Sequence, residues 1–335
     1  MFSAMTEMTV KEPLSNPRPL WPKAGYGAAG IPGIPGNPGA PPMGEARYPA
    51  KSGVPRPALK AGRFSLSLER PLIMGIVNVT PDSFSDGGKF FDSGPALDHA
   101  KRLLEEGADI LDVGGESSRP GAEPVEFNEE LRRLLPVLER LVELPVPVSV
   151  DTCKPEVMRR AIAAGAAMIN DTYALRAQGA LTAVAESPVA VCLMHMQGEP
   201  RTMQRAPHYR DVFGEVETFL VERAAAAAAA GIGRDRIVLD PGFGFGKTPR
   251  HNLELIRALP RLCEAGFPLL AGLSRKALFG KIVGREVAER VYASAAGALL
   301  AAQRGASIVR VHDVAATRDC LLVLRAIDDT TFSFP

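Results

Sequence analysis

Short apolar runs alternate with helix-like stretches along most of this chain. The apolar runs lie at 72–78, 108–115, 146–152, 166–172, 189–196, 236–242, 267–274 and 307–313. Amphipathic stretches come between them, as at 94–107, 127–144, 154–166 and 211–233, and many of these end in glycine, as a helix C-cap does. Near-continuous apolar strands that are each followed by a helix indicate a parallel sheet buried on both faces.

The number of strand–helix units selects between two architectures. Eight units over about 270 residues match the size of a (β/α)8 TIM barrel. The alternative is a doubly wound open sheet, in which G-x-G-x-x-G would be expected after the first strand, and no such motif is present. We therefore predict an α/β fold with a (β/α)8 TIM barrel over residues 63–335. Polar–apolar alternation at 63–69 predicts a short exposed strand or hairpin before the barrel.

The first sixty or so residues have a different composition. The stretch GIPGIPGNPGAP at 30–41 contains four Gly-x-Pro-like triplets, and proline recurs up to Pro57. A collagen triple helix needs this repeat over a far longer run and in three chains. We therefore expect residues 1–62 to form a disordered, extended tail that buries too little apolar surface to order itself.

Overall composition narrows the class of partner. The chain has 39 basic and 38 acidic residues, which gives no electrostatic reason to expect nucleic acid or an anionic membrane. It has no eighteen-residue apolar run and no apolar segment at its start that would indicate a secretory signal. The four cysteines form no C-x-x-C pair, which is typical of a reducing compartment. These features predict a cytoplasmic protein and give no reason to expect nucleic acid or a membrane as its partner.

All eight predicted strands end in polar or ionisable side chains. Barrel enzymes build their sites at this face. One aspartate at a strand end usually caps the next helix, as Asp151 before TCKPE would, but capping does not explain eight cases of eight. In strand order the set is Asn78, Glu116 to Arg119, Asp151, Asn170 and Asp171, His195, Asp240, Ser274 to Lys276, and Arg310, His312 and Asp313.

The chemistry of this set differs between its two halves. Asp151, Asn170 and Asp240 offer acceptors and an amide, which suit a ligand rich in N–H donors such as an aminopyrimidinone ring. Arg310 and His312 stand at i and i+2 on one strand, so they point the same way and offer donors suited to phosphate. The sequence therefore predicts a site for a nitrogen heterocycle at one end and a phosphate at the other.

Two further motifs have a structural interpretation. The stretch DPGFGFGK at 240–247 lacks the spacing of a phosphate-binding loop, so we interpret it as a tight turn with Phe245 at the rim and Lys247 of secondary importance. His195 is a lone histidine among apolar residues, which favours a core or rim group whose ring nitrogens are hydrogen-bonded within the protein.

The sequence contains no histidine motif that would predict a metal held by protein ligands alone. Mg²⁺ held by one side-chain oxygen and a pyrophosphate is compatible with the sequence.

The motifs taken together resemble one family. MGIVNVTPDSFSDGG, ADILDVGGESSRPGA, SVDT, MIND, MHMQG, DPGFGFGK, SRK and RVHDV are similar, in this order, to the dihydropteroate synthases of folate biosynthesis. The resemblance covers about residue 64 to the C-terminus. It implies a transferase that condenses hydroxymethyl-dihydropterin pyrophosphate with p-aminobenzoate and releases pyrophosphate.

The resemblance also implies roles for individual residues. Pterin would be bound by Asp151, Asn170, Asp240 and Lys276. Pyrophosphate would be bound by Asn78, Ser118, Arg119, Arg310 and His312, with Mg²⁺ on Asn78. p-Aminobenzoate would be bound by Phe84, Pro120, Phe245 and Ser274. The catalytic set would be Asp86, Lys276, Arg310 and His312, with Asp86 near the reacting methylene.

The stretch NVTPDSFSDGG at 78–88 is long for a connection from strand to helix, which usually takes about two to six residues. By resemblance it is a lid that folds over the pterin. Pyrophosphate would leave first, and the lid would keep water from the resulting cation until the arylamine attacks.

Two positions depart from the family pattern. Ser118 stands where threonine is common, and Ala277 stands where many members place a serine near the aminobenzoate carboxylate. The second departure leaves that carboxylate contact open and keeps a non-catalytic pterin-binding paralogue as an alternative. A methyltetrahydrofolate methyltransferase on the same barrel would lack the lid motif and the Arg-x-His pair. A stretch at 287–306 is apolar nearly all round, which predicts a homodimer through the late helices.

Overall fold

Eight parallel strands form the centre of the computed structural model, which describes residues 58–79, 94–117 and 121–332. Each strand lies within its predicted range, and the order around the ring is β8-β7-β6-β5-β4-β3-β10-β9. A parallel bridge from Leu239 to Leu269 joins β8 to β9 and completes the ring. The predicted TIM barrel is confirmed. The strands are β3 (Leu72–Asn78), β4 (Ile110–Gly114), β5 (Val148–Asp151), β6 (Met168–Asp171), β7 (Ala190–Met194), β8 (Ile237–Asp240), β9 (Leu270–Ala271) and β10 (Ile308–Val311).

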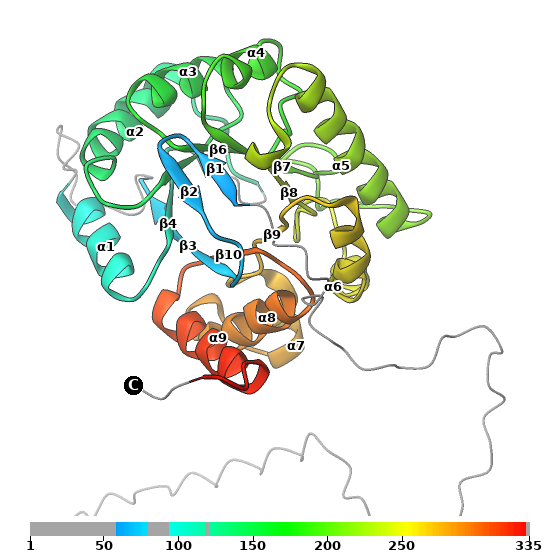
Figure 1. Cartoon of the computed structure of the whole chain (residues 1–335). Helices are drawn as coiled ribbons and strands as arrows, with labels where there is room; N and C mark the ends of the chain where they lie inside the picture. Colours follow the sequence, from blue (N-terminus) through cyan, green and yellow to red (C-terminus); the bar gives the residue numbers. More distant parts are fainter. Residues whose placement is uncertain (1–57, 80–93, 118–120, 333–335) are drawn as a thin grey trace, which may run out of the picture. The chain divides into compact units, whose positions relative to one another are not determined.

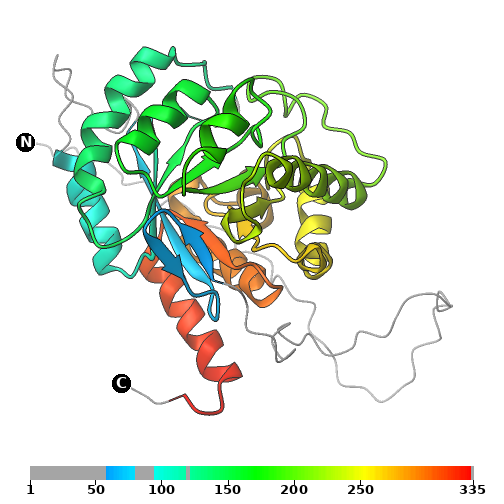
Figure 2. The same ribbon diagram turned by 45° about the horizontal axis from the view of Figure 1, so that its top comes forward.

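Helices surround this ring (Figures 1 and 2). None of the described helices is long and apolar enough to span a membrane. One helix, α7, was not predicted separately, and it comes before the main helix of its unit. The helices are α1 (Gly94–Glu105), α2 (Phe127–Leu141), α3 (Pro155–Ala163), α4 (Ala180–Ala185), α5 (Val212–Ala229), α6 (Pro249–Leu262), α7 (Ala277–Val283), α8 (Val291–Gln303) and α9 (Val314–Asp328), with short 3-10 turns at Arg234–Arg236, Cys263–Ala265 and Val287–Glu289.

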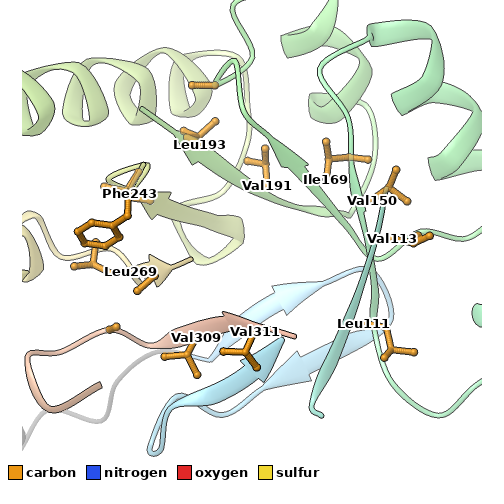
Figure 3. Packing of buried hydrophobic residues seen from close by; sticks show 14 of the residues in the cluster. Leu111, Val113, Val150, Ile169, Val191, Leu193, Phe243, Leu269, Val309 and Val311 are labelled. Atoms are coloured by element: carbon orange, nitrogen blue, oxygen red, sulfur yellow. The ribbon is translucent and has the colours of Figure 1, made fainter. Parts of the chain in front are cut away.

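Alternation along the strands divides the core in two. Outward-facing residues such as Leu111, Val150 and Val191 pack against the helices (Figure 3). Inward-facing residues such as Met74 and Met168 form a separate apolar cluster inside the ring. Further along the same strands the inward positions become polar, so the apolar filling ends before the C-terminal ends of the strands. The half of the barrel at the N-terminal ends of the strands, the lower half, is therefore filled with apolar side chains. The half at the C-terminal ends, the upper half, is lined by polar side chains.

A hairpin closes the lower half of the barrel. Strand β1 (Leu59–Ala61) pairs antiparallel with β2 (Phe64–Leu66). The range 63–69, predicted as a short strand or hairpin, contains β2, whereas β1 lies in the stretch that was predicted to be part of the disordered tail. Leu59 and Ala61 are each 1% exposed and belong to the inner apolar cluster. The N–H of Gly62 donates to the carbonyl of Pro188, just before β7, at 3.1 Å. The sequence-based boundary at residue 63 therefore falls inside the hairpin, between its two strands.

The hairpin gives a prediction for truncation. Removal of residues 1–57 is expected to leave the melting temperature and activity nearly unchanged, because their composition favours a tail that buries little. Removal of residues 1–62 deletes the buried side chains of β1 and should destabilise the barrel. Leu59→Ala alone is expected to lower the free energy of unfolding by about 2–5 kcal/mol. Lys60→Ala is the control, because Lys60 is exposed and its substitution should change that free energy little. Urea unfolding measures all four proteins, and equal stability of the two truncations would contradict the role of β1.

Candidate active site

Four side chains from four strands meet inside the upper half of the barrel. The Nε of Arg310 in β10 donates to Oδ2 of Asp112 in β4 at 2.6 Å, and its Nη2 donates to Oδ2 of Asp151 in β5 at 2.8 Å. The Nδ2 of Asn170 in β6 donates to the same oxygen of Asp112 at 3.2 Å. The predicted pterin residues Asp151 and Asn170 therefore lie in one hydrogen-bonded group with Arg310.

Asp112 is a site residue that the sequence analysis missed. Its side chain is fully buried, and its Oδ1 has no hydrogen-bond partner among the described residues. It escaped notice because it stands in the middle of the apolar run 108–115 and not at its end. The available signal was an ionisable residue within a buried strand, which must have a partner inside the barrel.

The charges of this group are unequal, with two carboxylates around one guanidinium. Burial raises the pKa of Asp151 to about 7, with Arg310 opposing the shift and Asp112 adding to it. Burial by itself lowers the pKa of Arg310, but Asp112 and Asp151 outweigh it and raise that pKa above its usual value. The arrangement therefore keeps Arg310 cationic. It also leaves carboxylate oxygens, such as Oδ1 of Asp112, able to accept hydrogen bonds from the N–H groups of a ligand.

Asp240 and Lys276 complete the wall of the site at β8 and after β9. Oδ1 of Asp240 accepts from the N–H of Gly242 at 2.7 Å, and burial raises the pKa of this carboxyl to about 6. Burial, followed by repulsion from Arg310, lowers the pKa of Lys276 to about 8. The Nζ of Lys276 lies 4.2 Å from the ring centroid of Phe245, which is partly buried at the rim as predicted.

These two pKa values predict how pterin binding depends on pH. Asp240 accepts N–H donors when ionised, so affinity should fall as the pH drops below about 6. Lys276 donates when protonated, so affinity should also fall as the pH rises above about 8. Calorimetric titration with a pterin from pH 5 to pH 9 is expected to give a maximum between these values. A flat profile would contradict the assignment of the two groups.

His312 is held by Ser274, which lies three residues after the end of β9. Its Nδ1 lies 3.0 Å from Oγ of Ser274, and its backbone N–H donates to the same oxygen at 3.2 Å. The hydroxyl of Ser274 is thus engaged with His312, while its predicted contact with aminobenzoate stays a prediction. Arg275, between Ser274 and Lys276, has a φ of 56° and donates to both carboxylate oxygens of Asp313 at 2.6 and 3.0 Å. That ion pair fixes the turn from which Lys276 enters the site.

Several rim residues serve local structure. The carboxylate of Asp171 accepts from two backbone N–H groups of the following turn, each at 2.7 Å. Glu116 is bonded to Lys154 and accepts from the N–H of Val125 at 3.1 Å, which fastens the chain after β4. His195 is buried, as its interpretation as a core or rim group required. Asp151 does not cap α3, whose N-cap is Lys154 without a side-chain cap bond.

The other predicted residues divide between the described and undescribed parts of the chain. Asn78 is the last residue of β3 and is partly buried at the C-terminal end of the barrel. Within the described ranges, no group of three or more His, Cys, Asp or Glu residues could hold a metal ion. The remaining predicted site residues lie outside the described residues, and their roles stay predictions: Phe84, Asp86, Ser118, Arg119 and Pro120.

Comparison with known proteins agrees with this site. The sequence model of a family described as pterin binding enzyme matches residues 74–312. The dihydropteroate synthase of Neisseria meningitidis serogroup B is 52% identical over 275 residues, which cover 80% of this chain and 96% of that protein. The structure of Xanthomonas albilineans dihydropteroate synthase with 4-aminobenzoic acid has a TM-score of 0.78 and 58% identity, covering 82% of this chain and 99% of that one.

A second structure of the Xanthomonas albilineans enzyme, in complex with 7,8-dihydropteroate, has a TM-score of 0.75 and 55% identity. The match covers 82% of this chain and 100% of that chain. The barrel and its acidic upper half therefore define a pterin-binding enzyme. Within that class, the chain belongs to the dihydropteroate synthase family, and it is a transferase of folate biosynthesis.

Proposed function

We propose that the family's reaction, the condensation of hydroxymethyl-dihydropterin pyrophosphate with p-aminobenzoate, takes place among the polar residues at the C-terminal end of this barrel. One observation carries the proposal. Asp112, Asp151 and Asp240 place three carboxylates close to the single guanidinium of Arg310, and Oδ1 of Asp112 has no hydrogen-bond partner among the described residues. A flat ring with several N–H donors satisfies such a set, because an unpaired buried acceptor costs free energy.

The pterin occupies the deeper part of the site in this proposal. Asp240 and Asp151 accept from the ring's N–H groups, and Asn170 offers both an amide donor and an acceptor. Lys276 donates to a ring oxygen or nitrogen from the other side. Arg310 keeps its ion pairs with Asp112 and Asp151 through Nε and Nη2, and its other N–H groups donate to the pyrophosphate.

The pyrophosphate occupies the outer part, beside His312 and Asn78. His312 follows Arg310 by two residues and therefore lies nearer the open end of the barrel on the same side. Asn78 fits a role in holding Mg²⁺, because its amide oxygen is a hard ligand at the right end of the barrel and Mg²⁺ usually keeps few protein ligands besides phosphate and water. When bound, Mg²⁺ would neutralise charge on the departing pyrophosphate.

The chemistry requires one bond to break before the other forms. The bond from the pterin methylene to the pyrophosphate oxygen breaks, and its electron pair leaves with pyrophosphate. The cation that remains is delocalised into the ring, where the buried carboxylates of Asp112, Asp151 and Asp240 stabilise positive charge. The neutral amine of p-aminobenzoate then attacks the methylene and loses a proton, which needs no strong base because an arylamine is unprotonated at pH 7.

Incorporation of labelled p-aminobenzoate tests the function. With Mg²⁺ and the pterin pyrophosphate present, the purified chain is expected to form labelled dihydropteroate and an equal amount of pyrophosphate. A pterin-binding paralogue would bind the pterin and form no product. A methyltransferase would instead transfer the methyl group of methyltetrahydrofolate to an acceptor molecule and form no dihydropteroate. Either result would contradict the proposed function.

The late helices support a homodimer. Large apolar side chains are exposed on α7, α8 and α9, among them Ile282 at 57%, Tyr292 at 86% and Ile327 at 74%. Helices α7, α8 and α9 lie together on one side of the barrel (Figure 1). Several large apolar side chains exposed on neighbouring helices are typical of an interface. We therefore assign this surface to a second copy of the chain.

Light scattering tests the dimer. The wild-type chain is expected to be a dimer at micromolar concentration, and Ile327→Glu should shift it to a monomer because the charge would be buried in the interface. Val221→Glu on α5 is the matched control, since Val221 is 44% exposed on a different helix and its variant should stay dimeric. A wild-type monomer at this concentration would contradict the assignment.

The four cysteines agree with a cytoplasmic location. None of them forms a disulfide bond, although Cys153, Cys263 and Cys320 are only partly buried. Free thiols persist in the reducing cytosol. We accordingly propose that the enzyme works in the cytoplasm.

A further inference from the structure

Lys247 lies beneath the glycine-rich turn and faces the protein interior. Its side chain is buried, and its Nζ donates to the carbonyls of Gly242 at 2.9 Å and Phe245 at 3.0 Å. The same atom lies 2.9 Å from Nδ1 of His195 and 3.3 Å from the carbonyl of His195. An ammonium group has three N–H donors, and these partners occupy all of them. Lys247 therefore has no donor left for a phosphate.

The turn above Lys247 is built by close approach of two backbones. Gly242 and Gly246 have φ angles of 66° and 61°. A Cβ at Gly242 would lie 1.8 Å from the carbonyl oxygen of His195, and a Cβ at Gly246 would lie 2.3 Å from that of Gln197. This packing turns several carbonyls inward, where they need donors. Burial lowers the pKa of Lys247 to about 7, so the amine is kept there against a desolvation penalty.

The turn holds Phe245 at the rim of the site. The N–H of Phe245 donates to the carbonyl of Gly242 at 3.1 Å, and its carbonyl accepts from Lys247. The ring packs against a buried cluster of methionines that includes Met194 and Met203, and it faces Nζ of Lys276. Lys247 thus bonds both Phe245 and the carbonyl that Phe245 itself uses, so the ring's place depends on the buried amine.

Asp240 is fixed at its backbone by the sheet, while its carboxylate accepts from the N–H of Gly242 at the start of the turn. It ends β8, which pairs with β7, and its backbone carbonyl accepts from the N–H of His195 at 2.9 Å. Loss of the amine of Lys247 would therefore release the middle of the turn and leave the start of the turn in the sheet. The sheet thus holds the backbone of Asp240 on the pterin side, whereas Lys247 holds the carbonyls of the turn on the Phe245 side.

We infer that Lys247 is a positioning residue for the second substrate, which holds Phe245 in place without touching either substrate. The inference rests on the proposed function, in which Phe245 lines the p-aminobenzoate pocket. It assigns a role to the last residue of the DPGFGFGK motif that is distinct from phosphate binding.

A double-mutant cycle tests this role. Lys247→Met keeps the length of the side chain and removes its donors. It is expected to raise KM for p-aminobenzoate by about tenfold, because a small displacement of a positioning group weakens substrate placement. The pterin dissociation constant, measured by calorimetry, should stay within about twofold of wild type. Phe245→Ala should raise KM as well, and adding Lys247→Met to it should change KM little, because residues that act through one another are not additive.

Lys247→Gln provides a second variant. Its side-chain amide keeps two N–H donors, so this substitution should raise KM for p-aminobenzoate less than Lys247→Met does. An unchanged KM in Lys247→Met, a parallel loss of pterin affinity, or additive effects with Phe245→Ala would each overturn the inference. Failure of both Lys247 variants to fold would also overturn it, because Lys247 would then be required by the barrel itself.

The wild-type chain in the same assay separates the inference from the proposed function. If the wild type forms no dihydropteroate, the proposed function fails, and a crystal structure of Lys247→Met then decides the inference. The ring of Phe245 is expected to leave its place over Lys276 in that structure. A ring whose centroid stays within about 6 Å of Nζ of Lys276, the range of a cation–π contact, would overturn the positioning role.

Discussion

Asp240→Ala is expected to abolish measurable binding of the pterin substrate. The ring's N–H donors would lose a buried charged acceptor, and each hydrogen bond to a charged group is worth about 1.5–3 kcal/mol. Asp240→Asn should weaken binding nearly as much, because its new amide NH₂ group would face a ring N–H group. Calorimetric titration with a pterin measures both effects.

The matched control is Asp98→Asn on α1, because Asp98 is exposed on the outer surface of the barrel. This variant removes the same charge and should bind the pterin as the wild type does. Near-normal affinity in Asp240→Ala or Asp240→Asn would refute the role of Asp240 as the ring's acceptor.

Arg310→Met is expected to lower both activity and stability. The substitution leaves Asp112 and Asp151 buried without their guanidinium partner, and breaking a buried ion pair in this way costs about 3–5 kcal/mol. The loss should be largest at pH 7 and smaller at pH 5. Arg310 opposes the raised pKa of Asp151, so without Arg310 the pKa of Asp151 in the folded state lies further above its unfolded value; the folded state then binds more protons, and its relative stability rises as the pH falls. Urea unfolding at the two pH values measures this change.

A second substitution separates stability from activity in this network. Adding Asp112→Asn to Arg310→Met removes one of the two unpaired charges and should recover part of the lost unfolding free energy. Activity should not return, because the guanidinium group is still missing. A loss of stability that does not change between pH 7 and pH 5 would contradict the charge balance described for Asp112, Asp151 and Arg310.

The framework of the fold could be predicted from local pattern. Each of the eight apolar runs contains a strand, because residues that are buried on both faces of a parallel sheet leave an uninterrupted apolar signature. The polar residues at the ends of those runs reach one rim because parallel strands all end at the same face. Asp151, Asn170 and Asp240 were found in this way from their positions alone.

The pairings inside the site could not be predicted in the same way. Asp112 and Arg310 are 198 residues apart, and only closure of the barrel brings them together. Strand β1 has three residues beside a proline-rich segment, so its apolar pattern was too short to stand out. From the sequence, Lys247 can be interpreted as a phosphate-loop lysine or as a turn residue. Its hydrogen bonds to three carbonyls depend on the contact between its own turn and the segment after β7 that contains His195.

A crystal structure of this chain with the pterin and pyrophosphate bound tests the account most directly. We expect the ring to lie inside the upper half of the barrel, with its N–H groups at about 3 Å from carboxylate oxygens of Asp240 and from the side chain of Asn170. The pyrophosphate should lie on the side of His312 and Asn78. A ring bound outside the barrel, or one that makes no hydrogen bond to Asp240 or Asn170, would contradict the assignment of this site.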